Sequence, residues 1–139
     1  MRRIDTSEQL IEDFLSRRVF AIVGATRKKE KYGYRIFRIL KDAGYKVYPV
    51  NPKYDEIEGE RCYASLSELP EKPDVVDIVV PPDVTEIIVR EAHELGINRI
   101  WMQPGSESAS AIKFCEDNGM LVLHDVCVME ESLKQRQRR

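Results

Sequence analysis

The residues best suited to binding chemistry come directly after an apolar run. Residues 19–23 are all apolar, and Gly24, Ala25, Thr26 and Arg27 follow them. A glycine at the end of a strand permits a tight turn, and backbone N–H groups that precede a helix can hold an anion. Thr26 adds a hydroxyl and Arg27 a positive charge. We therefore predict a phosphate-binding loop here.

This loop departs from the dinucleotide-binding motif G-x-G-x-x-G. It is longer, and the third glycine of that motif is missing. For residues 29–31, a lysine-rich exposed loop is the simpler interpretation. The loop alone therefore leaves the nature of the nucleotide open.

The second apolar run narrows that choice, because it ends in Asn51, Pro52 and Lys53. A nicotinamide site places an acidic residue at this point to hold the ribose 2′-hydroxyl. A cation attracts a further phosphate instead, whereas a carboxylate repels one. Lys53 therefore disfavours NAD and favours an adenine nucleotide with an extra phosphate, either NADP or coenzyme A.

The loops after the third and fourth apolar runs offer weaker signals. Val80 and Pro81 can form an apolar wall against an adenine ring or a pantetheine arm, although they also suit an ordinary strand exit. Gln103 and Gly105 lie in a turn that leads toward a helix N-terminus and supplies an amide side chain with backbone N–H groups. We expect both loops to border the ligand.

No catalytic constellation is visible in the sequence. His124 and Asp125 are neighbours at the end of a predicted strand, so their side chains should point to opposite faces and not pair. Cys127 could be a reactive thiol near the ligand, but buried, inert cysteines are commoner. The sequence therefore predicts a binding site without catalytic or metal-ligating residues.

The elements that must position these loops alternate between apolar runs and helix-period segments. This alternation predicts βαβ units, hence an α/β fold: one Rossmann-like, doubly wound domain whose five-stranded parallel sheet has helices on both faces. We expect the strand order 3-2-1-4-5, with the reversal between the first and fourth strands. Thr6 can cap a first helix, and a short helical turn is expected at 65–69. Predicted strands begin near residues 19, 45, 75, 99 and 120.

Composition limits the remaining classes of protein. The 139 residues suit one domain, which we place at 1–131, followed by a basic, frayed tail at 132–139. No apolar run reaches the length of a membrane span, and the net charge of −2 disfavours a nucleic-acid binder. The three cysteines form no CxxC pair, which indicates a reducing, cytoplasmic location.

The order of several short motifs resembles that of the small stand-alone CoA-binding domain proteins. The resemblance covers residues 15–131. The motifs that carry it are Val23-Gly24-Ala25-Thr26, Tyr34-Arg35, Gly44-Tyr45-x-Val47-x-Pro49-Val50-Asn51-Pro52-Lys53, Asp77-Ile78-Val79, Trp101-x-Gln103-x-Gly105 and Asp125-x-Cys127-x-x-x-Glu131.

The resemblance implies a Rossmann-like domain that binds coenzyme A, as does the N-terminal domain of the succinyl-CoA synthetase alpha subunit. The second synthetase domain, which carries a phosphorylated histidine, has no counterpart in these residues, so the resemblance does not imply ligase activity. It leaves the roles of Asp125, Cys127 and Glu131 open. It implies that the ligand lies against Gly24, Ala25, Thr26, Arg27, Tyr34, Arg35, Lys53, Val80, Pro81, Gln103 and Gly105.

These observations predict a protein that binds coenzyme A or acyl-CoA and has no catalytic machinery of its own. The alternative is an NADP-dependent oxidoreductase, or a CoA-ligase or transferase component, completed by a partner chain. A third hypothesis is an RNA- or anion-binding surface at the basic tail and the first loop. A homo-oligomer and a mixed disulfide between Cys127 and CoA are further hypotheses. The sequence does not indicate an acyl group.

Overall fold

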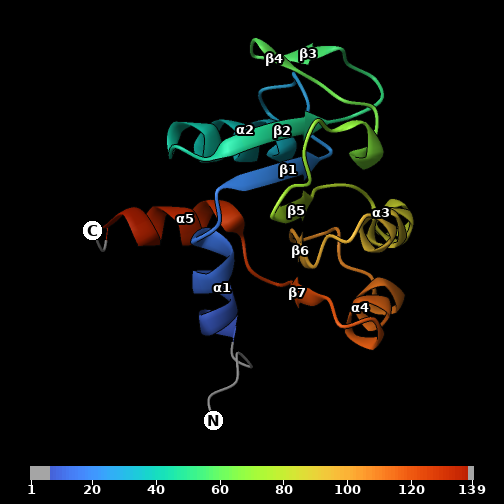
Figure 1. Ribbon diagram of the computed structural model, residues 1–139. Helices are drawn as coiled ribbons and strands as arrows, with labels where there is room; N and C mark the ends of the chain where they lie inside the picture. Colours follow the sequence, from blue (N-terminus) through green and yellow to red (C-terminus); the bar gives the residue numbers. More distant parts are fainter. Residues whose placement is uncertain (1–6, 138–139) are drawn as a thin grey trace.

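One parallel β-sheet forms the centre of the computed structural model, which describes residues 7–137 (Figure 1). Short apolar runs form its strands, and in the middle strands nearly every side chain is buried. All neighbouring strands pair in parallel, so the predicted five-stranded α/β fold is confirmed. In spatial order the strands are β2 (Lys46–Val50), β1 (Val19–Val23), β5 (Val75–Ile78), β6 (Arg99–Met102) and β7 (Leu121–Leu123).

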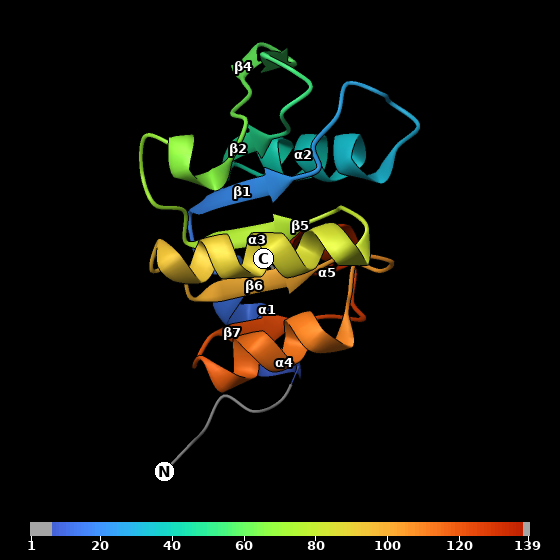
Figure 2. The same cartoon turned by 90° about the vertical axis from the view of Figure 1, so that its right-hand side faces the viewer.

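Helices cover both faces of this sheet, as Figures 1 and 2 show. Each helix buries one apolar stripe against the strands, and the buried side chains form two hydrophobic clusters, one on each face. The first face carries α1 (Ser7–Leu15), α2 (Tyr32–Asp42) and α5 (Val128–Gln137), and the second carries α3 (Pro82–Glu94) and α4 (Ala109–Asp117).

The strand order differs from the expected 3-2-1-4-5 in one placement. The third long strand, β5, pairs with β1 on the side away from β2, which gives the order 2-1-3-4-5. Pro49 explains why β2 lies at the edge: its carbonyl accepts a hydrogen bond from the Tyr63 N–H on the outer side, where its own nitrogen has no hydrogen to donate. The strand order therefore reverses between β1 and β5 and not between the first and fourth strands.

The segment between β2 and β5 contains a β-hairpin that the sequence pattern does not predict. The hairpin pairs β3 (Glu56–Ile57) with β4 (Glu60–Arg61). Glu58 and Gly59 form its turn with φ angles of 51° and 81°, the positive values that a two-residue hairpin turn of type I′ requires. The expected helical turn at 65–69 is confirmed as the 3₁₀ helix η1 (Leu66–Glu68).

The C-terminal helix α5 runs across the predicted boundary between residues 131 and 132. Ser132 is buried, and residues 134–137 are helical where a frayed tail was expected. The expected cap Thr6 and the last two arginines lie outside the described residues. Within residues 7–137, no helix combines the length and the apolar character needed to cross a membrane.

Candidate functional site

Two pockets lie side by side where β1, β2 and β5 end, and they share Gly24, Asn51 and Lys53. The first, which we call the polar pocket, has a volume of about 390 Å³; the second, the apolar pocket, has about 400 Å³. Both lie at the strand-order reversal, where open α/β sheets bind ligands. Besides the shared residues, Thr26, Lys28, Lys31, Tyr32 and Tyr54 line the polar pocket, and Val23, Val50, Val80, Pro81, Val84 and Ile88 line the apolar one.

A third depression, of about 370 Å³, lies at the opposite end of the sheet, where strands β1 and β2 begin. It is lined by residues 15–18 and 43–46, which precede β1 and enter β2, together with part of α5. Because ligands of this architecture bind at the carboxyl ends of the strands, the polar and apolar pockets form the candidate site.

Two glycines bring the first loop and helix α2 into close contact. A Cβ at Gly24 would lie 2.2 Å from the Val79 carbonyl oxygen, and a Cβ at Gly33 would lie 2.2 Å from the Gly24 carbonyl oxygen. Gly33 thus allows the close helix–loop packing that the third glycine of a dinucleotide-binding motif provides. Gly33 therefore fills the role of the third motif glycine, although it lies further along the chain than the motif places that glycine.

Asn51 fixes the first loop to the end of β2. Its Nδ2 donates to the Ala25 carbonyl at 2.8 Å, and its Oδ1 accepts from the Lys53 N–H at 2.9 Å. Ala25 is fully buried and packs in the hydrophobic core under the first loop. Lys53, by contrast, is exposed where the two pockets meet. The site prediction missed Asn51, although its place directly after a strand was a usable signal.

Tyr54 is a second residue that the site prediction missed. Its hydroxyl lies 3.0 Å from the Thr26 Oγ1, and its ring lies under the Arg27 guanidinium, 5.3 Å from centroid to carbon. The hydrogen bond to Thr26 lowers the pKa of Tyr54, and the backbone of Arg27 and the charges of Lys28 and Lys53 act in the same direction. Of the two first-loop residues that contact Tyr54, Thr26 lines the polar pocket and Arg27 lines neither pocket.

Tyr34 and Arg35 lie away from both pockets, although the sequence placed them at the ligand. Tyr34 faces the β3–β4 hairpin, where desolvation and a hydrogen bond to Glu58 raise its pKa. Arg35 is exposed on α2. Tyr32, two residues earlier, lines the polar pocket instead, because the first turn of α2 directs that side chain toward the strand ends.

Gln103 is fully buried and does not border a pocket, contrary to expectation. Its Nε2 donates to Oδ1 of Asp77 at 2.6 Å, and its Oε1 accepts from the Val128 N–H at 3.0 Å at the start of α5. Burial raises the pKa of Asp77 to about 8, although the Gln103 hydrogen bond opposes the shift. Gly105 is exposed with a φ of 96° and lines neither pocket. Through Gln103, the loop after β6 therefore connects strand β5 with the start of helix α5 by hydrogen bonds.

Val80 and Pro81 line the apolar pocket, as the sequence predicted. They follow the end of β5, and Val84 and Ile88 of α3 continue the same apolar wall. An aromatic ring fits this wall better than a charged group, because these four apolar side chains offer a charge no hydrogen-bond or ionic partner.

A family model described as "CoA binding domain" matches residues 18–132. The chain belongs to the CoA binding domain family. The family model spans every strand of the sheet and all the residues that line the two pockets.

The CoA binding domain described here is similar both to short chains and to parts of longer ones. It is 34% identical to a hypothetical protein from Pyrococcus horikoshii OT3, with a TM-score of 0.88 and 96% of each chain covered. It is 43% identical to the acetate–CoA ligase (ADP-forming) of Methanocaldococcus jannaschii over 55% of this chain and 11% of that protein. It is 35% identical to the acetate–CoA ligase (ADP-forming) II subunit alpha of Pyrococcus furiosus over 66% of this chain and 20% of that one. The chain thus spans a fifth or less of these two ligases.

Further polar contacts of this CoA binding domain involve the C-terminal part of the chain. Tyr32 donates to the Cys127 Sγ at 2.6 Å, and desolvation together with this hydrogen bond raises the pKa of the phenol. His124 Nδ1 lies 2.6 Å from Asp125 Oδ2, so the expectation that these two do not pair is wrong. Both residues follow the end of β7, and Asp125 has a φ of 66°, so strand alternation does not apply to them. Glu131 pairs with Lys134 at 3.3 Å.

Proposed function

We propose that this CoA binding domain binds coenzyme A, or an acyl-CoA, across its two pockets. The adenine ring occupies the apolar pocket against Val80 and Pro81, where its flat apolar surface is buried. The phosphates occupy the polar pocket, where Lys28 and Lys31 supply positive charge and the N-terminus of α2 supplies backbone N–H groups.

The position of Lys53 is the observation that supports this proposal most directly. It lies beyond the end of β2 and borders both pockets, so its ammonium group can meet a phosphate attached to the ribose between adenine and diphosphate. Coenzyme A carries such a 3′-phosphate. Membership of the CoA binding domain family favours coenzyme A over NADP, which also carries a third phosphate.

Calorimetric titration with four nucleotides tests the proposal: CoA, 3′-dephospho-CoA, NADP and NAD. We expect CoA to bind most tightly. The Lys53→Met variant should bind CoA about tenfold more weakly, because a charge-assisted hydrogen bond is lost, and 3′-dephospho-CoA with less than about a twofold change. Lys29→Met is the matched control, because Lys29 is exposed and lines neither pocket. Binding of NADP or NAD without binding of CoA would contradict the proposal.

A second candidate function is that of a nucleotide-binding component completed by a partner chain. The similarity to a ligase subunit alpha favours it, since that name describes one chain of several. Affinity capture from the native cells, followed by an assay of acyl-CoA formation, tests this function. A chain that elutes alone, or as a homo-oligomer, and gives no turnover would contradict it.

We also propose a reducing, cytoplasmic location. All three cysteines are free and buried, so the fold does not use a disulfide. Detection of the protein only in a membrane or secreted fraction would contradict this location.

A further inference from the structure

Arg27 is directed toward the protein and not toward the ligand pockets. Its Nε donates to the Glu56 carbonyl at 2.7 Å, and its guanidinium lies over the Tyr54 ring. Lys28 and Lys53, by contrast, line the polar pocket. Of the basic residues that the sequence assigns to phosphate binding, Lys28 and Lys53 thus face the polar pocket, whereas Arg27 faces Tyr54 in the pocket wall.

The wall that Arg27 supports carries two hydroxyl groups. Tyr54 lines the polar pocket, and its hydroxyl shares a hydrogen bond of 3.0 Å with the Thr26 Oγ1. The same Oγ1 accepts from the Lys28 N–H at 3.2 Å. The Tyr54 hydroxyl therefore holds the Thr26 hydroxyl, which in turn accepts a hydrogen bond from the backbone of the first loop.

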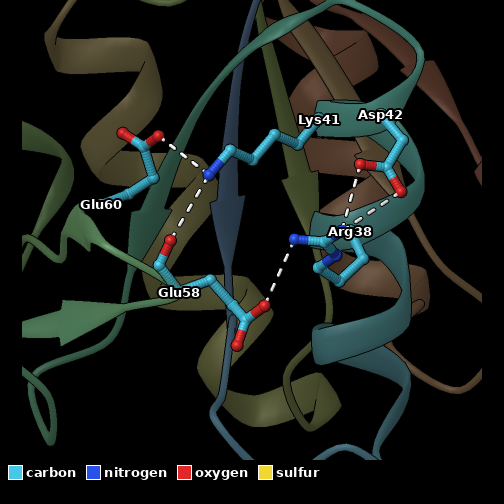
Figure 3. Close-up of polar contacts among 5 residues, drawn as sticks. All are labelled: Arg38, Lys41, Asp42, Glu58 and Glu60. Carbon is cyan, nitrogen blue, oxygen red and sulfur yellow. Dashed lines mark hydrogen bonds and ion pairs between the residues drawn. The ribbon is translucent and has the colours of Figure 1, made fainter.

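Helix α2 holds the β3–β4 hairpin, which carries the Glu56 carbonyl, through side-chain contacts at the hairpin turn (Figure 3). At the hairpin turn, Arg38 contacts the Glu58 carboxylate at 3.2 Å, and Lys41 contacts the Glu58 carbonyl at 3.4 Å. Lys41 also pairs with Glu60 at 3.0 Å. The hairpin that presents the Glu56 carbonyl is therefore fixed to the same helix whose N-terminus borders the polar pocket.

We infer that Arg27 is a positioning residue for the nucleotide site: it holds the Tyr54 ring against Thr26 and does not itself contact a phosphate. The inference rests on the proposed binding of CoA. Arg27 acts through a cation–π contact and one hydrogen bond to a backbone carbonyl, and its effect on the ligand passes through Tyr54.

A double-mutant cycle on CoA affinity tests this inference, with Arg27→Met, Tyr54→Ala and the double variant measured by calorimetry. Arg27→Met should weaken CoA binding about fivefold in the natural chain and less than about twofold in the Tyr54→Ala background. It should leave the salt dependence of binding unchanged, because no phosphate contact is lost. Arg61→Met is the matched control: Arg61 lies over the Tyr63 ring at 5.2 Å on the same hairpin, and neither residue lines a pocket.

Thermal unfolding of each variant separates loss of fold from loss of positioning, and Tyr54→Phe keeps the ring while removing the hydroxyl. The inference is supported if the effect of Arg27→Met on CoA binding disappears in Tyr54→Ala and shrinks in Tyr54→Phe, which keeps the ring under Arg27 but lacks the hydroxyl that meets Thr26. Equal losses in all Tyr54 backgrounds, together with a shallower salt dependence, would show that Arg27 contacts a phosphate and would overturn it. A natural chain that does not bind CoA would overturn the proposed function and, with it, this inference.

Discussion

The buried carboxyl group of Asp77 should make the stability of this protein depend strongly on pH. Asp77 is fully buried in β5, and its Oδ1 accepts one hydrogen bond from Gln103. Its Oδ2 has no hydrogen-bond partner in the part of the chain that the structure describes. Burial raises its pKa from 3.8 to about 8. Replacing it with asparagine preserves the shape of the side chain and removes the titration.

The size and the sign of the effect follow from these two pKa values. Below pH 3.8 both the folded and the unfolded chain hold the Asp77 proton, so Asp77 adds no penalty there. Between pH 3.8 and about 8 the unfolded chain releases the proton while the folded protein retains it, so stability falls as pH rises. The slope is about 1.4 kcal/mol per pH unit, which amounts to about 4 kcal/mol at pH 7.

Urea unfolding of the natural chain and Asp77→Asn between pH 4.5 and 8 measures this penalty. The variant should be more stable by about 1 kcal/mol at pH 4.5 and by about 4 kcal/mol at pH 7. Asp117→Asn is the control, because Asp117 is exposed and pairs with Lys113 one helical turn earlier; it should change stability by less than about 0.5 kcal/mol. A difference between Asp77→Asn and the natural chain that does not grow with pH would refute the reasoning.

Gly33→Ala, with Gly119→Ala as its control, tests the packing of the first loop, and Arg99→Gln tests a partly buried ion-pair cluster. Gly33→Ala should destabilise the protein by about 2 kcal/mol or more and weaken CoA binding, because the new Cβ meets the Gly24 carbonyl; Gly119→Ala, which meets no atom but has a positive φ, should cost about 1 kcal/mol in thermal unfolding. Burial opposes ionisation of Asp13, but hydrogen bonds and charges from Arg99 and Arg17 outweigh it and lower the Asp13 pKa. Arg99→Gln should therefore cost about 1 kcal/mol at pH 7 by urea unfolding, and the cost should shrink as pH falls through the Asp13 pKa; a cost that is constant with pH would contradict this account.

The alternation of apolar runs and helical segments was sufficient to predict the fold class. A fully apolar run such as 19–23 can only be buried on both faces, and helices on both sides of a parallel sheet provide that burial. The strand order required one more observation, the proline in β2. Pro49 lacks the N–H that an interior strand needs, and this places β2 at the edge of the sheet. The proline is visible in the sequence, so the edge position of β2 was predictable from the sequence alone.

The candidate site was predicted as a set of loops but not as a set of contacts. Strand ends meet at one edge of a parallel sheet, so Gly24, Thr26, Lys53, Val80 and Pro81 fell at the two pockets as expected. The direction of a side chain on a loop or at a helix start depends on backbone angles that sequence spacing does not give. For that reason Tyr34, Arg35 and Gln103 proved to lie elsewhere, while Asn51, Tyr32 and Tyr54 were missed.

By itself, the sequence determined the parallel sheet, the position of the loops at the strand ends and the cation after the second strand. These features follow from neighbours in the chain: hydrophobic periodicity, glycine and proline placement, and side-chain charge. The tertiary structure alone decided that Arg27 faces Tyr54, that Gln103 bonds to the buried Asp77, and that Gly33 packs on Gly24. Each of these contacts joins residues that are separated in the sequence, so only the packing of the whole chain fixes which groups meet.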